Sequence, residues 1–213
     1  VAPPPEKLKL GLAWRQALGH RPVWLPASSR EGEEILILEA FARLKRPDVL
    51  LLIVPRHPQR SPEVATLVAE RKLTLCRRSE DGFPGPDTQV WLGDSMGEMP
   101  AYFTLADIAL IGGTLLPFGG QNLIEAAACS CPVLLGPHTF NFAQATEDAL
   151  ACGAARRITD AAEAATEVEK LLGDQPALDT MRHAAINFSQ AHRGATAKTV
   201  ALIREIIESR TAD

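Results

Sequence analysis

Six short, almost wholly apolar runs, separated by stretches with helical spacing, constrain the fold of this chain more than any other feature. Each run is too short for a globular helix, and a strand that is continuously apolar is buried on both faces. Buried strands that alternate with helices indicate a parallel sheet covered on both sides, so the sequence predicts an α/β fold with a doubly wound parallel sheet. The runs are PVWLPA (22–27), VLLLIV (49–54), LTLC (73–76), QVWLG (89–93), DIALIG (107–112) and PVLLG (132–136).

We expect this sheet and its helices to form a Rossmann-like domain over residues 21–160, with different segments on either side. VAPPPEKLKL opens the chain with three consecutive prolines, which favour extended backbone, so residues 1–20 are expected to be a linker that follows a preceding domain. From about residue 160, three alanine-rich helical stretches follow without a further strong strand. Residues 161–213 are therefore expected to be helices that pack on the same domain.

The composition argues against several classes of function. A formal net charge of −4 provides no basic surface of the kind that binds nucleic acid. No apolar stretch approaches the ~20 residues that span a bilayer. The four cysteines have neither zinc-ribbon nor CxxC spacing, and Cys129 and Cys131 are expected to be buried, reduced thiols in a cytoplasmic setting. The histidines are scattered without metal-ligand spacing, so we expect no metal.

Three loops rich in glycine and polar residues follow predicted strands and are the best candidates for a binding site. They are Pro55–Pro58, Gly93–Glu98 and the loop GGTLLPFGGQ, which begins at Gly112. In an open parallel sheet the carboxyl ends of the strands lie on one rim, where ligands bind, so these loops are expected to converge. No dinucleotide-binding GxGxxG follows the first predicted strand, and the sequence does not contain the P-loop GxxxxGK[ST].

The residue types in these loops favour a nucleotide phosphate as the ligand. Arg56 offers a planar pair of donors that can grip a phosphate, although a surface ion pair would also explain it. Gly119 and Gly120 precede a predicted helix, whose unpaired first amides attract anions. Glu125 either stabilises the first turn of that helix or accepts both hydroxyls of a ribose, and Asn122 either caps the helix or contacts the ligand. Spacing alone does not separate these alternatives.

Five motifs occur in order along the chain: PASSREGEE (26–34), VPRHPQR (54–60), GDSMGEM (93–99), GGTLLPFGGQNLIEAAA (112–128) and PVLLGPHTFNF (132–142). Together they resemble the 3-deoxy-D-manno-octulosonic acid (Kdo) transferase family of lipopolysaccharide synthesis. The resemblance implies that the chain is the carboxyl-terminal, donor-binding half of a two-domain GT-B glycosyltransferase. The other half would carry the membrane anchor and the catalytic carboxylate, so no catalytic residue is expected in this chain.

The resemblance also implies the reaction. The whole enzyme would transfer Kdo from CMP-Kdo to a lipid A precursor, at the cytoplasmic face of the bacterial inner membrane. It would need neither a metal nor a cofactor. The implied partners are therefore CMP-Kdo, the lipid acceptor and the amino-terminal GT-B domain.

The resemblance assigns roles to individual residues. Arg56 would meet the phosphate of CMP, and Glu125 its ribose. The chain departs from the family at Arg30 and Gln121, where histidines are usual, at Gln59, where glutamate is usual, and at Leu123, where proline is usual. The residues implied to line the CMP pocket are Pro55, Arg56, Met96, Gly97, Glu98, Asn122, Leu123, Ile124 and Glu125, and those implied to contact the donor or the acceptor are Ser29, Arg30, Gly120 and Gln121.

Two other functions fit the same architecture. A nucleotide-sugar epimerase of the GT-B type would favour a uridine nucleotide over CMP. A non-catalytic nucleotide-binding module would be a stable domain whose ligand changes its oligomeric state. The proline-rich start favours a multidomain enzyme over the second alternative.

Overall fold

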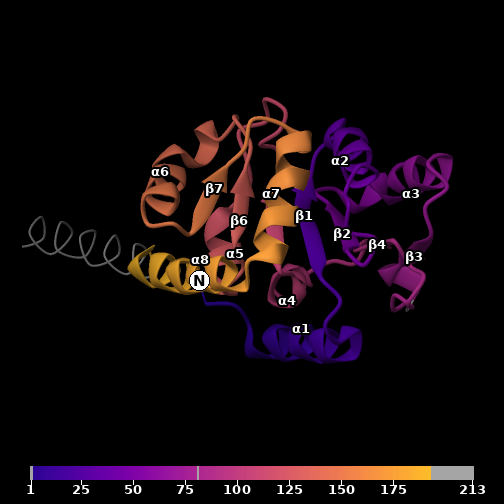
Figure 1. Ribbon diagram of the computed structural model, residues 1–213, viewed down its shortest axis with the longest axis horizontal. Helices are drawn as coiled ribbons and strands as arrows, with labels where there is room; N and C mark the ends of the chain where they lie inside the picture. Colours follow the sequence, from indigo (N-terminus) through magenta and orange to yellow (C-terminus); the bar gives the residue numbers. More distant parts are fainter. Residues whose placement is uncertain (1, 81, 193–213) are drawn as a thin grey trace, which may run out of the picture.

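The computed structural model describes residues 2–80 and 82–192 and contains one seven-stranded parallel sheet, in the order β3-β4-β2-β1-β5-β6-β7 (Figure 1). Every neighbouring pair of strands is parallel, which confirms the predicted fold class. The strands are β1 (Val23–Ser29), β2 (Leu50–Pro55), β3 (Leu75–Arg77), β4 (Val90–Leu92), β5 (Ile108–Ile111), β6 (Val133–Leu135) and β7 (Ala155–Arg157).

Helices cover both faces of the sheet and enclose two apolar cores. One core lies under α1, α4, α5, α6 and the second half of α8. The other lies under α2, α3, α7 and the first half of α8. The described α-helices are α1 (Pro5–Leu18), α2 (Glu33–Phe41), α3 (Ser61–Glu70), α4 (Met99–Leu105), α5 (Leu123–Ala128), α6 (Ala143–Ala151), α7 (Ala161–Gly173) and α8 (Gln175–His192), and short 3-10 helices cover Pro58–Arg60, Arg78–Glu80 and Phe140–Phe142.

The prediction of an extended linker over residues 1–20 is wrong, because most of this segment is α1. Pro5 occupies the first turn of the helix, where proline is tolerated since its missing N–H has no intrahelical partner. Trp14 is 8% exposed and packs edge-on against Trp91 of β4, with ring centroids 5.2 Å apart. The same indole stacks on Tyr102 of α4 at 5.3 Å. The segment therefore belongs to the domain core.

β7 was not among the strands expected from the sequence. Ala155–Arg157 pairs with β6 at the edge of the sheet, and its three residues include two arginines. A run this short and polar does not show the apolar pattern by which the other strands were predicted. Two of the three expected carboxyl-terminal helices are α7 and α8, and the third falls on residues 193–213, outside the described residues. Within the described parts of the chain, no helix is both long enough and apolar enough to cross a membrane.

Candidate functional site

The strand order places a crevice between the loops that follow β1 and β5. After β1 the chain places three strands on one side of it, in the outward order β2, β4, β3, and then returns to pair β5 with the other side of β1. Where the order reverses in this way, two neighbouring loops leave the sheet in opposite directions and open a space between them. A pocket of about 150 Å³ lies there. It is lined by Ala27, Ser28, Arg56, Met99, Phe103, Ile111, Gln121, Asn122 and Glu125.

The glycine-rich loop after β5 follows a path that side chains would obstruct. Gly113, Gly119 and Gly120 have φ values of +73°, +89° and +83°, a region that favours glycine. A Cβ on Gly112 would lie 2.1 Å from the carbonyl oxygen of Ser28. The loop closes on itself where the Gly120 N–H donates to the Gly113 carbonyl at 2.8 Å. The glycines therefore serve backbone geometry and close approach, and they bring Gln121 to the pocket.

Arg56 supplies the cationic group of the pocket. Its backbone N–H donates to the Ser29 carbonyl at 2.9 Å, which ties the end of β2 to β1. Its side chain is exposed and makes no hydrogen bond or ion pair within residues 2–80 and 82–192. The surface ion pair considered above is thus absent from this part of the chain. A guanidinium without a protein partner at the mouth of a pocket is suited to bind an anion.

Asn122 caps α5 and also contacts Glu125. Its side-chain oxygen accepts the Ile124 N–H at 3.0 Å, and its amide nitrogen donates to the Glu125 carboxylate at 3.1 Å. The cap interpretation of Asn122 is therefore confirmed, and Asn122 lies at the pocket as well. Because the cap already satisfies the Ile124 amide, Arg56 is the better placed group for a phosphate. Glu125 is exposed and lines the pocket.

Several predicted residues direct their side chains elsewhere. Leu123 is 1% exposed in the core, and Ile124 packs against it. Ser29 is buried, and its hydroxyl donates to the Glu34 carboxylate at 2.8 Å. The Arg30 guanidinium lies over the Phe118 ring, 4.6 Å from its centroid. None of these four residues is among those that line the pocket.

The loop after β4 forms a neighbouring part of the rim. Met96 is 77% exposed, and Gly97 has a φ of +72°. The Glu98 carboxylate accepts hydrogen bonds from Ser95 and from Arg78, the latter at 3.1 Å. Burial alone would raise the pKa of Glu98, but these two donors outweigh it and hold that pKa below its ordinary value. Glu98 therefore holds the start of α4, and none of these three residues lines the pocket.

Sequence reasoning missed two features of this site. Ser28, next to the predicted Ser29, lines the pocket because the pairing of β1 with β2 shifts register there, and Ser28 has a φ of +58°. Glu33 is fully buried at the start of α2 and accepts the backbone N–H groups of Arg30, Gly113 and Leu115. Burial raises the pKa of Glu33, and these hydrogen bonds oppose the rise. The only sequence signal was an acidic first turn, which many helices have.

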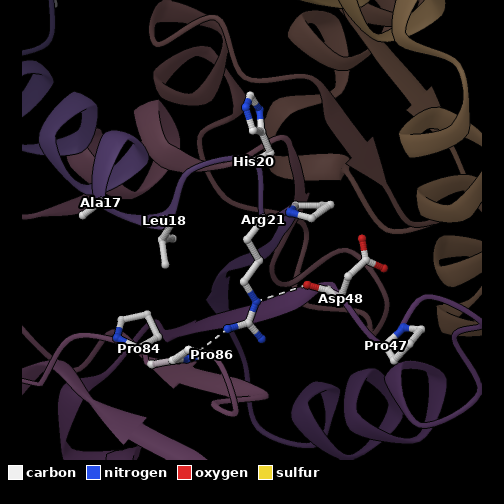
Figure 2. Close-up of a pocket in the computed structure, with 10 residues that line it drawn as sticks. Ala17, Leu18, His20, Arg21, Pro47, Asp48, Pro84 and Pro86 are labelled. Atoms are coloured by element: carbon white, nitrogen blue, oxygen red, sulfur yellow. Dashed lines mark hydrogen bonds between the residues drawn. The ribbon is translucent and has the colours of Figure 1, made fainter.

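A larger pocket of about 480 Å³ lies at the opposite end of the sheet (Figure 2). Its central group is Arg21, which precedes β1. The guanidinium donates to the main-chain carbonyls of Asp48 at 3.1 Å and Gly85 at 3.0 Å, and also to that of Thr88. These bonds join the loops at the amino ends of the strands, where open parallel sheets do not bind ligands. We therefore assign Arg21 a structural role.

The cysteines are free thiols in different environments. Cys131 is buried, as expected, whereas Cys129 and Cys76 are partly exposed and Cys152 is exposed. Burial raises the pKa of the Cys129 thiol to about 11. No group of three or more His, Cys, Asp or Glu side chains in the described residues could hold a metal ion. Metal independence itself stays a prediction.

Both a family model and individual relatives of known name identify glycosyltransferases as the proteins that this chain resembles. Residues 27–188 match the family model described as "Glycosyl transferases group 1". The chain is 46% identical to a 3-deoxy-D-manno-octulosonic acid transferase from Bordetella pertussis, over 94% of this chain and 48% of that protein. It is 36% identical to the enzyme of that name from Haemophilus influenzae, over 92% of this chain and 46% of that protein. The chain thus spans about half the length of these two transferases.

Solved structures agree with this picture. The C-terminal CMP-Kdo binding domain of WaaA from Acinetobacter baumannii superposes with a TM-score of 0.83 and 30% identity, over 87% of this chain and 98% of that domain. Anabaena HepE in complex with UDP-glucose superposes with a TM-score of 0.66 over 97% of this chain and 53% of that protein, but at 17% identity it shares only the fold. The chain belongs to the glycosyl transferases group 1 family and, within it, to the family of Kdo transferases.

Proposed function

We propose that this chain binds CMP-Kdo in the pocket between β1 and β5, and that the whole protein transfers Kdo from this donor to a lipid A precursor. By the same proposal, this transfer is a step of lipopolysaccharide synthesis and takes place at the cytoplasmic face of the bacterial inner membrane. The amino-terminal domain of the enzyme would complete the site. The relatives named Kdo transferases support this proposal over the epimerase and the non-catalytic module.

One observation carries the proposal. In a chain that matches a CMP-Kdo binding domain over 98% of that domain's length, an arginine, two carboxamides and a carboxylate converge on a single pocket at the reversal of strand order. Cation, hydrogen-bonding amides and anion are the groups that a nucleoside monophosphate needs. They come from the loop after β2, from the glycine loop after β5 and from the first turn of α5, far apart in sequence.

Each of these side chains has a chemical task in the proposal. The Arg56 guanidinium donates to the phosphate that joins cytidine to Kdo. The Glu125 carboxylate accepts hydrogen bonds from the two ribose hydroxyls. Asn122 holds Glu125 in place through its amide group, at 3.1 Å. Gln121 and Ser28 offer neutral donors and acceptors on the remaining walls.

During transfer, the bond between the anomeric carbon of Kdo and the phosphate oxygen breaks, and a bond to the acceptor hydroxyl oxygen forms. The acceptor proton passes to a base outside this chain, and CMP leaves with the bonding electron pair. Negative charge develops on the departing phosphate. Arg56 is placed to stabilise that charge.

Isothermal titration of the chain with CMP, UMP and inorganic phosphate tests the proposal. We expect CMP to bind more tightly than UMP by about tenfold or more, equivalent to about 1.4 kcal/mol. Phosphate alone should bind more weakly than either nucleotide. A preference for UMP would instead favour the epimerase alternative. Equally weak binding of CMP, UMP and phosphate would contradict the proposal that the pocket binds a nucleotide.

A further inference from the structure

Glu33 connects two loops that border the pocket, although its own side chain is outside it. One carboxylate oxygen accepts the Arg30 N–H at 2.8 Å and the Gly113 N–H at 2.7 Å. The other accepts the Leu115 N–H at 2.9 Å. Arg30 belongs to the loop after β1, whereas Gly113 and Leu115 lie in the glycine loop, 80 and 82 residues after Glu33.

A carboxylate is well suited to this place because it offers acceptors only. Glu33 is fully buried, where an unpaired charge would be very costly. Three backbone N–H groups donate to the carboxylate and compensate that cost. In return, the carboxylate satisfies these N–H groups, which belong to two loops without regular secondary structure. The glycine loop is also held from its far side, where the Thr114 hydroxyl accepts the Gly136 N–H at 3.0 Å. Glu33 thus fixes the side of the loop that faces β1.

We propose that Glu33 is the positioning residue of the donor site: it holds the glycine loop in its binding conformation before the nucleotide arrives. The inference rests on the proposed function, since the loop that Glu33 holds presents Gln121 and Asn122 to the pocket. Preorganisation of this kind raises affinity because the loop does not lose its freedom on binding.

Glu34 provides a matched control. It is the next residue of α2 and is also fully buried. One of its oxygens accepts the Ser29 hydroxyl and Arg60, both at 2.8 Å, while the other has no hydrogen-bond partner. Glu34→Gln can keep the bonded oxygen and direct its NH₂ group to the unpaired side. In Glu33→Gln no such arrangement is possible, because both oxygens of Glu33 accept backbone N–H groups. At least one of these N–H groups must then face the NH₂ group of the glutamine.

The test is calorimetric titration of CMP into the wild type and both variants, with circular dichroism to check folding. We expect Glu33→Gln to weaken CMP binding by about tenfold or more, the loss typical of an unsatisfied buried donor, and Glu34→Gln by less than about threefold. A folded Glu33→Gln that binds CMP within about threefold of the wild type overturns the inference. If the wild type binds no CMP, it is the proposed function that fails.

Amide hydrogen exchange in the wild type decides the matter even if Glu33→Gln does not fold. If Glu33 holds the loop in advance, the Gly113 and Leu115 amides are already protected without nucleotide, and CMP adds little protection. Fast exchange in the free chain that becomes slow only with CMP would mean that the ligand, and not Glu33, orders the loop. This measurement also stands on its own when no CMP binds.

Discussion

Arg56 is the residue on which the affinity of the pocket for an anion is expected to depend most. Arg56→Ala removes a charged donor from the phosphate and should cost about 1.5–3 kcal/mol, or about 10- to 150-fold in CMP affinity. The free energy of unfolding should hardly change, because in the described parts of the chain the side chain has no partner to lose.

Arg43→Ala is the control for this substitution. Arg43 is also exposed, but it lines a groove beside α7, away from the pocket. Calorimetry should show unchanged CMP binding for Arg43→Ala. If Arg56→Ala binds CMP as the wild type does, the phosphate lies elsewhere.

Glu125→Gln separates the two roles left open for this residue. If Glu125 binds the ribose, the substitution replaces one of its acceptor oxygens with a donor NH₂ group. The affinity for CMP should then fall by about tenfold, or roughly 1.4 kcal/mol. Inorganic phosphate has no diol and should bind as before. As a first-turn acid only, Glu125 contributes about 0.3–1 kcal/mol to stability, and both ligands should change little and equally.

A cytidine nucleotide without the 2′-hydroxyl sharpens this comparison. The wild type should prefer CMP over 2′-deoxy-CMP in the same titration, and Glu125→Gln should lose that preference. A preference that survives the substitution assigns the 2′-hydroxyl to another group.

At the scale of the elements, Trp14 should anchor α1 to the sheet. Trp14→Ala removes a buried indole between Trp91 and Tyr102 and should lower the free energy of unfolding by about 3–5 kcal/mol. Leu12→Ala, on the same helix but at a position 60% exposed, should change it by less than about 0.5 kcal/mol. Urea denaturation measures both. Equal effects would mean that α1 does not pack as described.

The strands and the rim of the site were predictable because each depends on a local pattern. Every apolar run of the sequence became a strand, and the rule that ligands bind at carboxyl ends brought Arg56, Asn122 and Glu125 to one pocket. α1 was missed because a run of prolines looks extended, although its last member fits the first turn of a helix. That ambiguity is resolved only by the packing of Trp14.

Side-chain direction in the site could not be predicted in the same way. Ser28 and not Ser29 lines the pocket, because a shift in strand register changes which residue faces outward. Leu123 faces the core because α5 packs against the sheet. Glu33 accepts hydrogen bonds from donors 80 and 82 residues away, which no local pattern records. These features arise only when distant segments meet.

At the scale of the whole molecule, Asp94 should make the fold sensitive to acid. Burial alone would raise its pKa, but hydrogen bonds from Ser79 and Arg77 outweigh this and lower it. A lowered pKa means that the carboxylate stabilises the fold above its unfolded-state pKa of about 3.9, and that this stability is lost as the pH falls through the folded-state value.

Asp94→Asn should therefore reduce the free energy of unfolding by about 1.5–3 kcal/mol at pH 7, and the difference from the wild type should shrink towards pH 3. Denaturation at several pH values measures it. Glu70→Gln is the control, since Glu70 is exposed on α3 and forms no ion pair within the described residues. A difference that is constant with pH would show that the charge of Asp94 is not responsible.

The contact between Trp14 and Trp91 also gives the chain an optical signal of its own. Their ring planes lie 75° apart, and Tyr102 lies within reach of both. Aromatic rings held in fixed asymmetric surroundings produce circular dichroism in the near ultraviolet, and this signal disappears when tertiary packing loosens. Because the three rings come from α1, β4 and α4, the spectrum reports on the docking of the amino-terminal helix without any attached dye.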